Sequence, residues 1–543
     1  MSESSSLVRS TFILTASIFI TKILGILYVI PFYAIIGGES NLAPYTYAYQ
    51  PYVVMLTIAG AGVPLAVAKY VSKYNALGAY RVSEKLYKSS LLVMSLSGLL
   101  GFIILYLLSP MIAEATLAGD GHQGAWSVDD ITHIMRVISF AVIFIPFLAT
   151  WRGIFQGYDS MGPTAVSTVI EQIARIIFLL VGAYLVLHVF DKGLLLANEV
   201  ATFAAAIGAV FALLTLWYYW RKRKPFIDQM IDSDATGIDV GYRSMYKEIL
   251  LYSIPFVIVS LCVPLYIMID QFTHNKGLAI AGVPAAQHDQ LLTMLNLTTN
   301  KLVMIPTSLA GGFAISVVPS ITRTFASGRI REMHQQIRTA LGVLMYLTVP
   351  ASLGILLLAA PLYTVFYSYD TTATHILMFY APVGILLSLM SVTAAILQGI
   401  DKQSLTVWIV LGSIVLKAVL NLPLIILFKT NGAVFATAIA LLFAIICNMI
   451  VIRKYAHFPL RSTLKETVQI ATFTAIMLMA TGFVYWILTQ FLSVEVKAQA
   501  LIIVIICGLV GGLVYGLITL KTGHAERYLG KRVGGLARKL HLS

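Results

Sequence analysis

The chain has 543 residues, of which 59% are hydrophobic and 11% are charged, and its formal net charge is +13. Soluble domains carry roughly 25% charged residues, so this composition excludes a soluble enzyme and indicates a polytopic membrane protein. We expect the basic excess to face anionic lipid headgroups, and it gives no evidence for nucleic acid binding.

Apolar stretches of roughly 20 to 28 residues recur along the chain, and each is long enough to cross a hydrocarbon core of about 30 Å. The prediction is an all-α membrane protein with fourteen transmembrane helices, which places both termini on one side. The expected spans are 10–35, 47–70, 88–110, 131–155, 163–189, 193–220, 247–272, 288–321, 338–360, 374–397, 405–428, 432–453, 466–491 and 498–520.

The orientation follows from the basic residues, because Lys and Arg are retained in short cytoplasmic segments. With the N-terminus in the cytoplasm, 28 of the 37 basic residues lie inside, five lie near the outer face and four lie within the membrane. We therefore expect cytoplasmic N and C termini. The tail after Leu520 is basic, and it is either an amphipathic segment on the inner leaflet or simply solvated.

Two stretches of the sequence repeat each other. IFQGYDSMGPTAV begins at Ile154 and ILQGIDKQSLTVW begins at Ile396, an offset of 242, and both QGxD turns separate a fourth from a fifth helix. Six helices lie between equivalent positions, so the halves are parallel repeats. We predict lobes at 1–220 and 247–455, a cytoplasmic linker at 221–246, two added helices in 456–520 and a basic tail at 521–543.

Charged side chains within the spans are the candidate functional residues. Lys22 lies near the middle of the first helix, where a lysine costs about 2.5 to 3.5 kcal/mol, so a cavity or partner is favoured over snorkelling. Glu171 and Arg175 stand four residues apart, a spacing that places them on one helix face. They form either a buried structural pair or a pair in which Glu171 neutralises Arg175 until an anion arrives.

Three further charged residues lie in the second half of the chain. Lys301 is either a cavity residue or an outer-interface anchor. Lys417 lies near the centre of its helix, at the position equivalent to Arg175, and we expect a cavity or coupling role. Asp270 lies at an outer helix end and is expected to face water. Four interior cations against one deep acid favour an anionic substrate, whereas a proton-coupled drug exporter is expected to show unpaired deep acids.

Hydrolytic machinery is not recognisable in the sequence. The chain contains no GxxxxGK[ST] loop, no HExxH and no Cys/His cluster, so we expect neither an enzyme nor a cofactor or metal site. The run GLVGGLVYG from Gly508 contains GxxxG, and we expect its glycines to serve close helix packing.

Several motifs together carry a family resemblance. The duplicated lobes, the QGxD turns, TKILGILYVIPFYAIIG in the first helix and KAVLNLPLIILFKTNGAVFATAIA over helices eleven and twelve resemble the MOP exporter superfamily. Within it, the chain is most similar to the polysaccharide-biosynthesis branch and its Gram-positive MurJ-type lipid II flippases. The resemblance implies a V-shaped molecule around a cationic cavity, and a groove on the last two helices for a polyprenyl tail.

The resemblance also assigns site residues. Cavity arginines of the family on helices one and eight fall on Lys22 and Lys301, whereas a family arginine on helix two has no equivalent in TYAYQPYVVMLTIAGAG. Some members bind sodium with polar groups of helices seven, eleven and twelve. Lys417 and Asn421 occupy two of these positions, and because an ammonium competes with the ion, we expect no sodium site and a built-in cation instead.

The resemblance implies a flippase that carries an undecaprenyl-pyrophosphate-linked precursor, most similar to lipid II, across the bacterial cell membrane. Two alternatives remain open: a flippase for another polyprenyl-linked polysaccharide, and an ion-coupled multidrug exporter. The expected partners are the anionic lipid-linked precursor, membrane lipids and, as a candidate, the cell-wall synthesis machinery. We expect a monomer.

Overall fold

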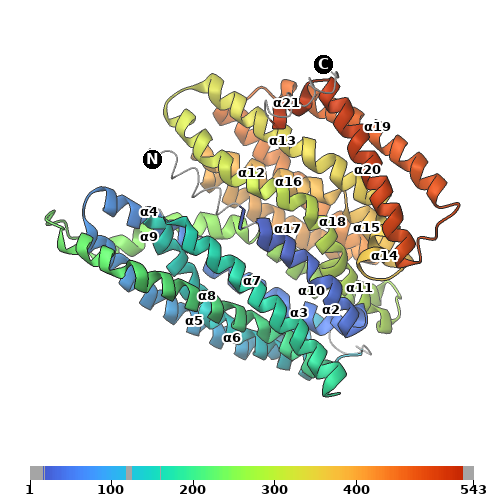
Figure 1. The fold of residues 1–543 in the computed structure, drawn as a ribbon, viewed down its shortest axis with the longest axis horizontal. Coiled ribbons are helices and arrows are strands. Elements are labelled where there is room, and N and C mark those ends of the chain that lie inside the picture. Colours follow the sequence, from blue (N-terminus) through green and yellow to red (C-terminus); the bar gives the residue numbers. More distant parts are fainter. Residues whose placement is uncertain (1–15, 18, 61, 118–124, 159, 530–543) are drawn as a thin grey trace. The chain divides into compact units, whose positions relative to one another are not determined.

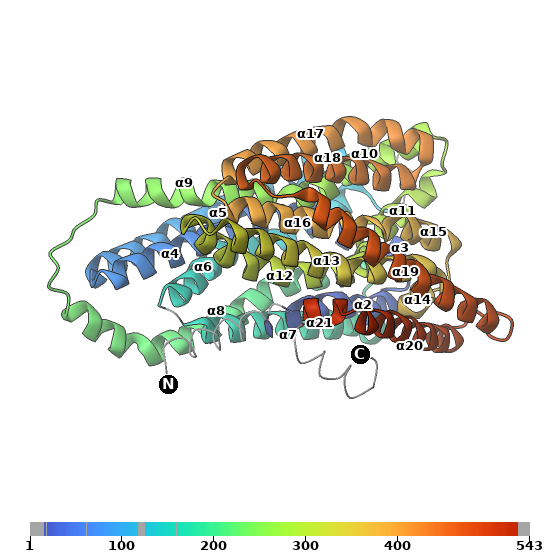
Figure 2. The ribbon, with the colours of Figure 1, turned by 90° about the horizontal axis from the view of Figure 1, so that it is seen from above.

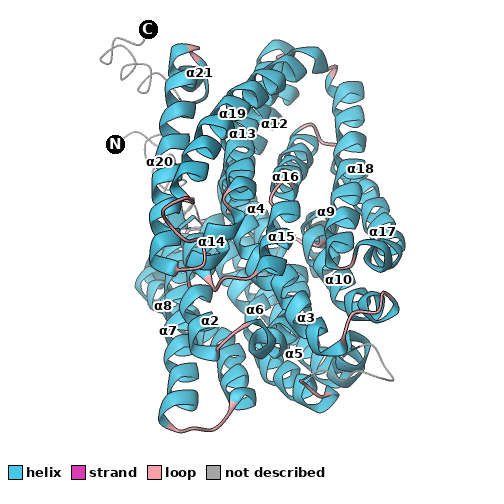
Figure 3. Ribbon diagram, turned by 90° about the vertical axis from the view of Figure 1, so that its right-hand side faces the viewer, coloured by secondary structure: helices cyan, strands magenta, loops and turns pink. Residues whose placement is uncertain are grey.

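The computed structural model describes residues 16–529 except 18, 61, 118–124 and 159. All its regular elements are helices, and no strand occurs among the described residues (Figure 3). The chain forms two compact units, Met1–Thr293 and Met294–Ser543. The boundary between the units lies inside the predicted span 288–321.

The first unit contains a first span, Phe19–Ile36, whose second part is α2 (Val29–Ile36). The helices that follow it are α3 (Glu39–Gly60), α4 (Val63–Ala76), α5 (Tyr80–Leu117), α6 (Val128–Gly157), α7 (Met161–Tyr184), the π-helix η1 (Leu185–Val189), α8 (Leu194–Asp232), α9 (Tyr242–Ser260), α10 (Cys262–Ile280), the short η2 (Ala285–Gln287) and α11 (His288–Thr293).

The second unit opens with the π-helix η3 (Met294–Thr299). The helices that follow it are α12 (Asn300–Ala326), α13 (Ile330–Leu357), α14 (Ala359–Phe366), α15 (Thr371–Tyr380), α16 (Val383–Gly399), α17 (Gln403–Phe428), α18 (Thr430–Ala456), α19 (Leu460–Leu488), α20 (Lys497–Lys521) and α21 (His524–Leu529). In Figure 1, α19 and α20 run side by side, with α21 at the end of α20.

Eleven helices of the described chain are long and apolar enough to cross a membrane, and the bent pair α9–α10 raises this number to twelve. The two predicted spans outside this set, 47–70 and 288–321, are the second helix of each repeat. Each is divided: the first into α3 and α4, the second into α11, η3 and α12. The structure is therefore consistent with fourteen spans without establishing that number.

The internal repeat is visible in the backbone itself. α6 ends at Gly157 and α16 at Gly399, while α7 begins at Met161 and α17 at Gln403, all at the offset of 242. Hydrogen bonds also repeat: Tyr158 N–H donates to the Ile154 carbonyl and Ile400 N–H to the Ile396 carbonyl, each at 3.1 Å. Asp159 of the first QGxD turn lies outside the described residues.

The connection between α8 and α9 runs at the left of Figure 2. Acidic residues tie it to the start of α5. Asp234 accepts a hydrogen bond of 2.8 Å from the Arg81 backbone N–H, and Asp239 forms a 2.8 Å ion pair with Lys85. These contacts hold the pKa of both carboxyls below their usual range. These contacts attach the middle of the predicted linker to the start of α5.

Candidate functional site

Lys22 lies in the first span of the first unit, and its side chain is exposed. No acceptor for its ammonium is found among the described residues. One turn later, Gly25 allows close approach to α7, because an added Cβ would lie 3.3 Å from the Gln172 amide nitrogen. The helix that carries Lys22 therefore packs on α7 while the lysine head stays accessible.

Arg175 of α7 is surrounded by tyrosines. Its guanidinium lies 5.1 Å from the centre of the Tyr49 ring, a cation–π distance, and Tyr28, Tyr45 and Tyr52 are its other electrostatic neighbours. Tyr45 stacks on Tyr49 with ring centres 5.4 Å apart, and the Tyr28 and Tyr45 hydroxyls are 2.9 Å apart. Tyrosines are neutral, so this cage stabilises the guanidinium without cancelling its charge.

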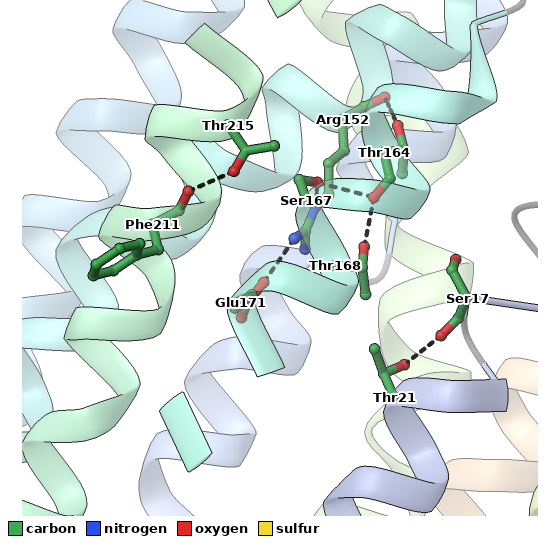
Figure 4. A network of polar contacts seen from close by, with 9 residues as sticks. All are labelled: Ser17, Thr21, Arg152, Thr164, Ser167, Thr168, Glu171, Phe211 and Thr215. Carbon is green, nitrogen blue, oxygen red and sulfur yellow. Dashed lines mark hydrogen bonds and ion pairs between the residues drawn. The ribbon is translucent and has the colours of Figure 1, made fainter. Parts of the chain in front are cut away.

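Glu171 does not pair with Arg175, so that prediction is wrong. Its carboxylate forms a 2.6 Å ion pair with Arg152 of α6, and the Arg152 Nε–H also donates to the Ser167 hydroxyl at 3.1 Å (Figure 4). Helix spacing is compatible with a Glu171–Arg175 contact, but α6 brings a second arginine to the same face of α7. This interhelical pair is electrically neutral.

Lys301 is half-buried at the start of α12, directly after η3. Two tyrosine contacts fix this irregular backbone: the Thr298 hydroxyl lies 2.8 Å from the Tyr363 hydroxyl, and the Asn300 amide donates to the Tyr380 hydroxyl at 2.8 Å. π-helical turns are frequent at functional sites. Here the turn sets the direction in which Lys301 leaves the helix.

Lys417 is fully buried between α17 and α18. Its ammonium donates to the Asn421 side-chain oxygen at 2.8 Å, the Ala433 carbonyl at 2.9 Å and the Thr437 hydroxyl at 2.7 Å. All three of these acceptors are neutral oxygens, the kind of ligand a hard monovalent cation prefers. The ammonium therefore occupies an oxygen shell of the type that binds a metal cation.

Asp270 does not face water, contrary to the prediction, because it is only 5% exposed within α10. The adjacent Gln271 belongs to a buried polar network of the first unit that the sequence did not reveal. Tyr47 of α3 donates to an Asp289 carboxylate oxygen and accepts a 3.2 Å hydrogen bond from the Asn275 amide. Gln271 donates to the Tyr47 carbonyl at 3.1 Å, so α3, α10 and α11 are joined at this point.

Several buried amides have an atom without a hydrogen-bond partner among the described residues. Among them are the Gln50 side-chain oxygen in the first unit and the Asn296 side-chain nitrogen in the second.

An apolar groove of about 550 Å³ lies in the second unit between α13–α14 and α19–α20. Pro350, Leu358 and Met477 contribute to its walls, and Gly508 and Gly512 of α20 form part of its floor. An added Cβ at either glycine would meet no atom within 4 Å. These two glycines therefore line a groove, whereas Gly511 between them packs closely as predicted, because an added Cβ there would lie 3.0 Å from the Thr481 hydroxyl oxygen.

Among the described residues, no group of three or more His, Cys, Asp or Glu side chains is placed to hold a metal ion. The first unit thus holds a cation among aromatic rings, and the second unit holds a buried ammonium among oxygens as well as an apolar groove. Cations suit an anionic headgroup, and an apolar groove suits a long hydrocarbon chain.

Known proteins are similar to this chain in sequence and in fold. Residues 7–325 match the family model described as "Polysaccharide biosynthesis protein". The chain is 41% identical to Lipid II flippase MurJ of Bacillus subtilis over 99% of both chains. Its fold is similar to Lipid II flippase MurJ in an inward closed conformation, with a TM-score of 0.65, 16% identity and coverage of 94% of this chain and 99% of that one.

The fold is also similar to an inward-facing multidrug resistance MATE family transporter of the MOP superfamily, with a TM-score of 0.63, 14% identity and coverage of 82% of this chain and 98% of that one. The many apolar helices and the full-length relative make the chain a multi-pass protein of the bacterial cell membrane. It belongs to the polysaccharide biosynthesis protein family.

Proposed function

We propose that the chain is a flippase that moves lipid II, an undecaprenyl-pyrophosphate-linked peptidoglycan precursor, from the inner to the outer leaflet. The observation that carries this proposal is the identity of 41% with a lipid II flippase over 99% of both chains. The site supports it chemically, because the interior cations suit a pyrophosphate and the apolar groove suits a polyprenyl tail. A second candidate, an ion-coupled multidrug exporter, is favoured by the MATE-like fold.

Arg175 supplies a cation in the first unit, in which the family arginine of helix two has no equivalent. The helix-two segment lacks the family arginine, yet its residues Tyr45, Tyr49 and Tyr52 in α3 surround an arginine supplied by α7. A guanidinium held by aromatic faces keeps its planar donors for a phosphate. Lys22, Arg175 and Lys301 are the proposed substrate-binding cations, and Gln50 and Asn296 are proposed to bind polar groups of the headgroup.

The proposed orientation has both termini in the cytoplasm, as the distribution of basic residues indicates. With the cell interior negative, outward movement of a dianion across 100 mV gains about 4.6 kcal/mol, at about 2.3 kcal/mol per charge. The emptied cationic cavity is then drawn inward by the same potential. Membrane potential therefore drives both halves of an alternating-access cycle in this proposal.

The proposal is tested by translocation of the lipid II headgroup in proteoliposomes. Lys22→Ala and Lys301→Ala each remove a charge contact and should slow translocation about tenfold or more. Lys22→Arg and Lys301→Arg should retain much of it. Lys497→Ala, at the exposed start of α20, is the matched control. Failure of the unmutated protein to translocate lipid II would refute the function.

Arg175 and the Arg152–Glu171 pair should separate transport from stability. Arg175→Ala should abolish most transport in a folded protein. Arg152→Ala or Glu171→Ala leaves one half-buried charge unpaired and should cost roughly 1–3 kcal/mol. The Arg152→Ala/Glu171→Ala double variant should regain part of that stability and still transport. Melting temperature and translocation are measured together, and a transport-dead but stable double variant would contradict this division of roles.

Lys417 is proposed to replace a coupling ion, so transport should respond to membrane potential and not specifically to sodium. Lys417→Asn leaves the oxygen shell of Asn421, Ala433 and Thr437 without its ammonium and should create sodium dependence. The measurement is translocation at a potential clamped with potassium and valinomycin, with sodium varied on each side. Lys429→Asn, in the same helix hairpin, is the control. A steep sodium requirement in the unmutated protein would overturn this proposal.

A further inference from the structure

A buried carboxylate in the second unit is shared by two arginines. Glu466 of α19 is 3% exposed. Its Oε1 lies 2.6 Å from Nε of Arg338 in α13 and 2.7 Å from Nη1 of Arg527 in α21. The Tyr528 hydroxyl donates to the other oxygen, Oε2, at 3.3 Å. We call these four residues the Glu466 cluster.

The Glu466 cluster has an excess of one positive charge. Its single carboxylate is nearly inaccessible, whereas the Arg338 and Arg527 side chains are 37% and 45% exposed. A guanidinium has five N–H donors, so each arginine retains donors beyond those that Glu466 accepts. Burial and the Glu466 carboxylate raise the pKa of Tyr528 to about 12, which keeps its hydroxyl a donor at neutral pH. The cluster therefore presents donors and positive charge outward.

The Glu466 cluster lies just beyond one end of the apolar groove. Tyr346 of α13 and Tyr515 of α20 line the groove there, and the Tyr528 ring lies 5.4 Å from the Tyr346 ring. Arg338 precedes Tyr346 by eight residues of α13, a distance of about 12 Å along the helix. Figure 1 shows α21 at this end of α20, beside α13. The apolar groove thus leads to the positively charged Glu466 cluster.

We propose that Arg338 and Arg527 bind the diphosphate of the lipid-linked substrate while its polyprenyl chain lies in the groove. This inference rests on the proposed function and adds a second, peripheral headgroup site to the interior cations. Arginine donors match phosphate oxygens in pairs, and the excess charge complements the anion. In the proposed orientation this end of the groove lies in the inner leaflet, so the site receives the substrate before it reaches the interior cations.

A purely structural role makes a different prediction. A clamp that anchors α21 loses strength whenever a member of the Glu466 cluster is removed. A diphosphate site is instead improved when its competing carboxylate is neutralised. Glu466→Gln and Arg527→Gln therefore have opposite effects on binding only if the cluster receives an anion.

The test is binding of undecaprenyl diphosphate to the purified full-length protein in detergent, measured by native mass spectrometry. Arg527→Gln should weaken binding about fivefold and Glu466→Gln should tighten it about fivefold, the effect of one charge worth about 1 kcal/mol. Uncharged undecaprenol should bind all variants equally. Arg329→Gln, which removes an exposed arginine paired with Glu332, is the matched control.

Arg527→Gln leaves Glu466 paired with Arg338, so we expect this variant to fold. It therefore tests diphosphate binding even if Glu466→Gln does not fold. Unchanged diphosphate binding in Arg527→Gln, or equal loss of undecaprenol binding, would overturn the inference. Equal competition by phosphatidylglycerol would also overturn it, because the occupant would then be an ordinary anionic lipid. If this binding pattern holds but lipid II is not translocated, the proposed function fails while the docking site stands.

Discussion

A positive charge inside a membrane must be stabilised by something, and the means of stabilisation determines what remains for a ligand. The chain uses three means. Arg152 is neutralised by Glu171, Arg175 is held by tyrosines, and Lys417 is held by neutral oxygens. Glu171 cancels the charge of Arg152, whereas the tyrosine rings around Arg175 and the three oxygens around Lys417 supply dipoles. Each of these cations is therefore stabilised by polar groups of its own unit.

The two repeats use equivalent positions for different purposes. Arg175 and Lys417 are related by the offset of 242, yet Arg175 lies half-buried among aromatic rings and Lys417 is fully enclosed. Arg152 and Glu171 of the first repeat correspond to Ala394 and Ser413 of the second, so the ion pair has no counterpart there. The two repeats therefore stabilise cations at equivalent positions with different surroundings.

The sequence was sufficient for the class of fold because membrane helices must satisfy their backbone internally and therefore appear as long apolar runs. The repeat was equally readable, and helix ends at Gly157 and Gly399 confirm it to the residue. The divided helices α3–α4 and α11–α12 were predicted as single spans, since hydropathy does not register a π-helix or a break within an apolar run.

Side-chain partners were less predictable. Helix spacing suggested Glu171 and Arg175 as a pair, but a contact from α6 decided the pairing, and sequence spacing within α7 carries no information about α6. The tyrosines of TYAYQPY were recognisable in the sequence, but their role could not be predicted from it. The structure shows that Arg175 lies beside Tyr49. The Glu466 cluster was missed because its members come from three helices that are distant in sequence.

In living cells, lipid II should reach the outer leaflet through this protein. The deciding experiment depletes the protein in its native cells and measures the leaflet distribution of lipid II, with an enzyme that cleaves only externally accessible headgroups. We expect lipid II synthesis to continue while the cleavable fraction falls, and re-expression to restore that fraction. An unchanged cleavable fraction in fully depleted cells, with no other flippase present, would show that the chain does not move lipid II.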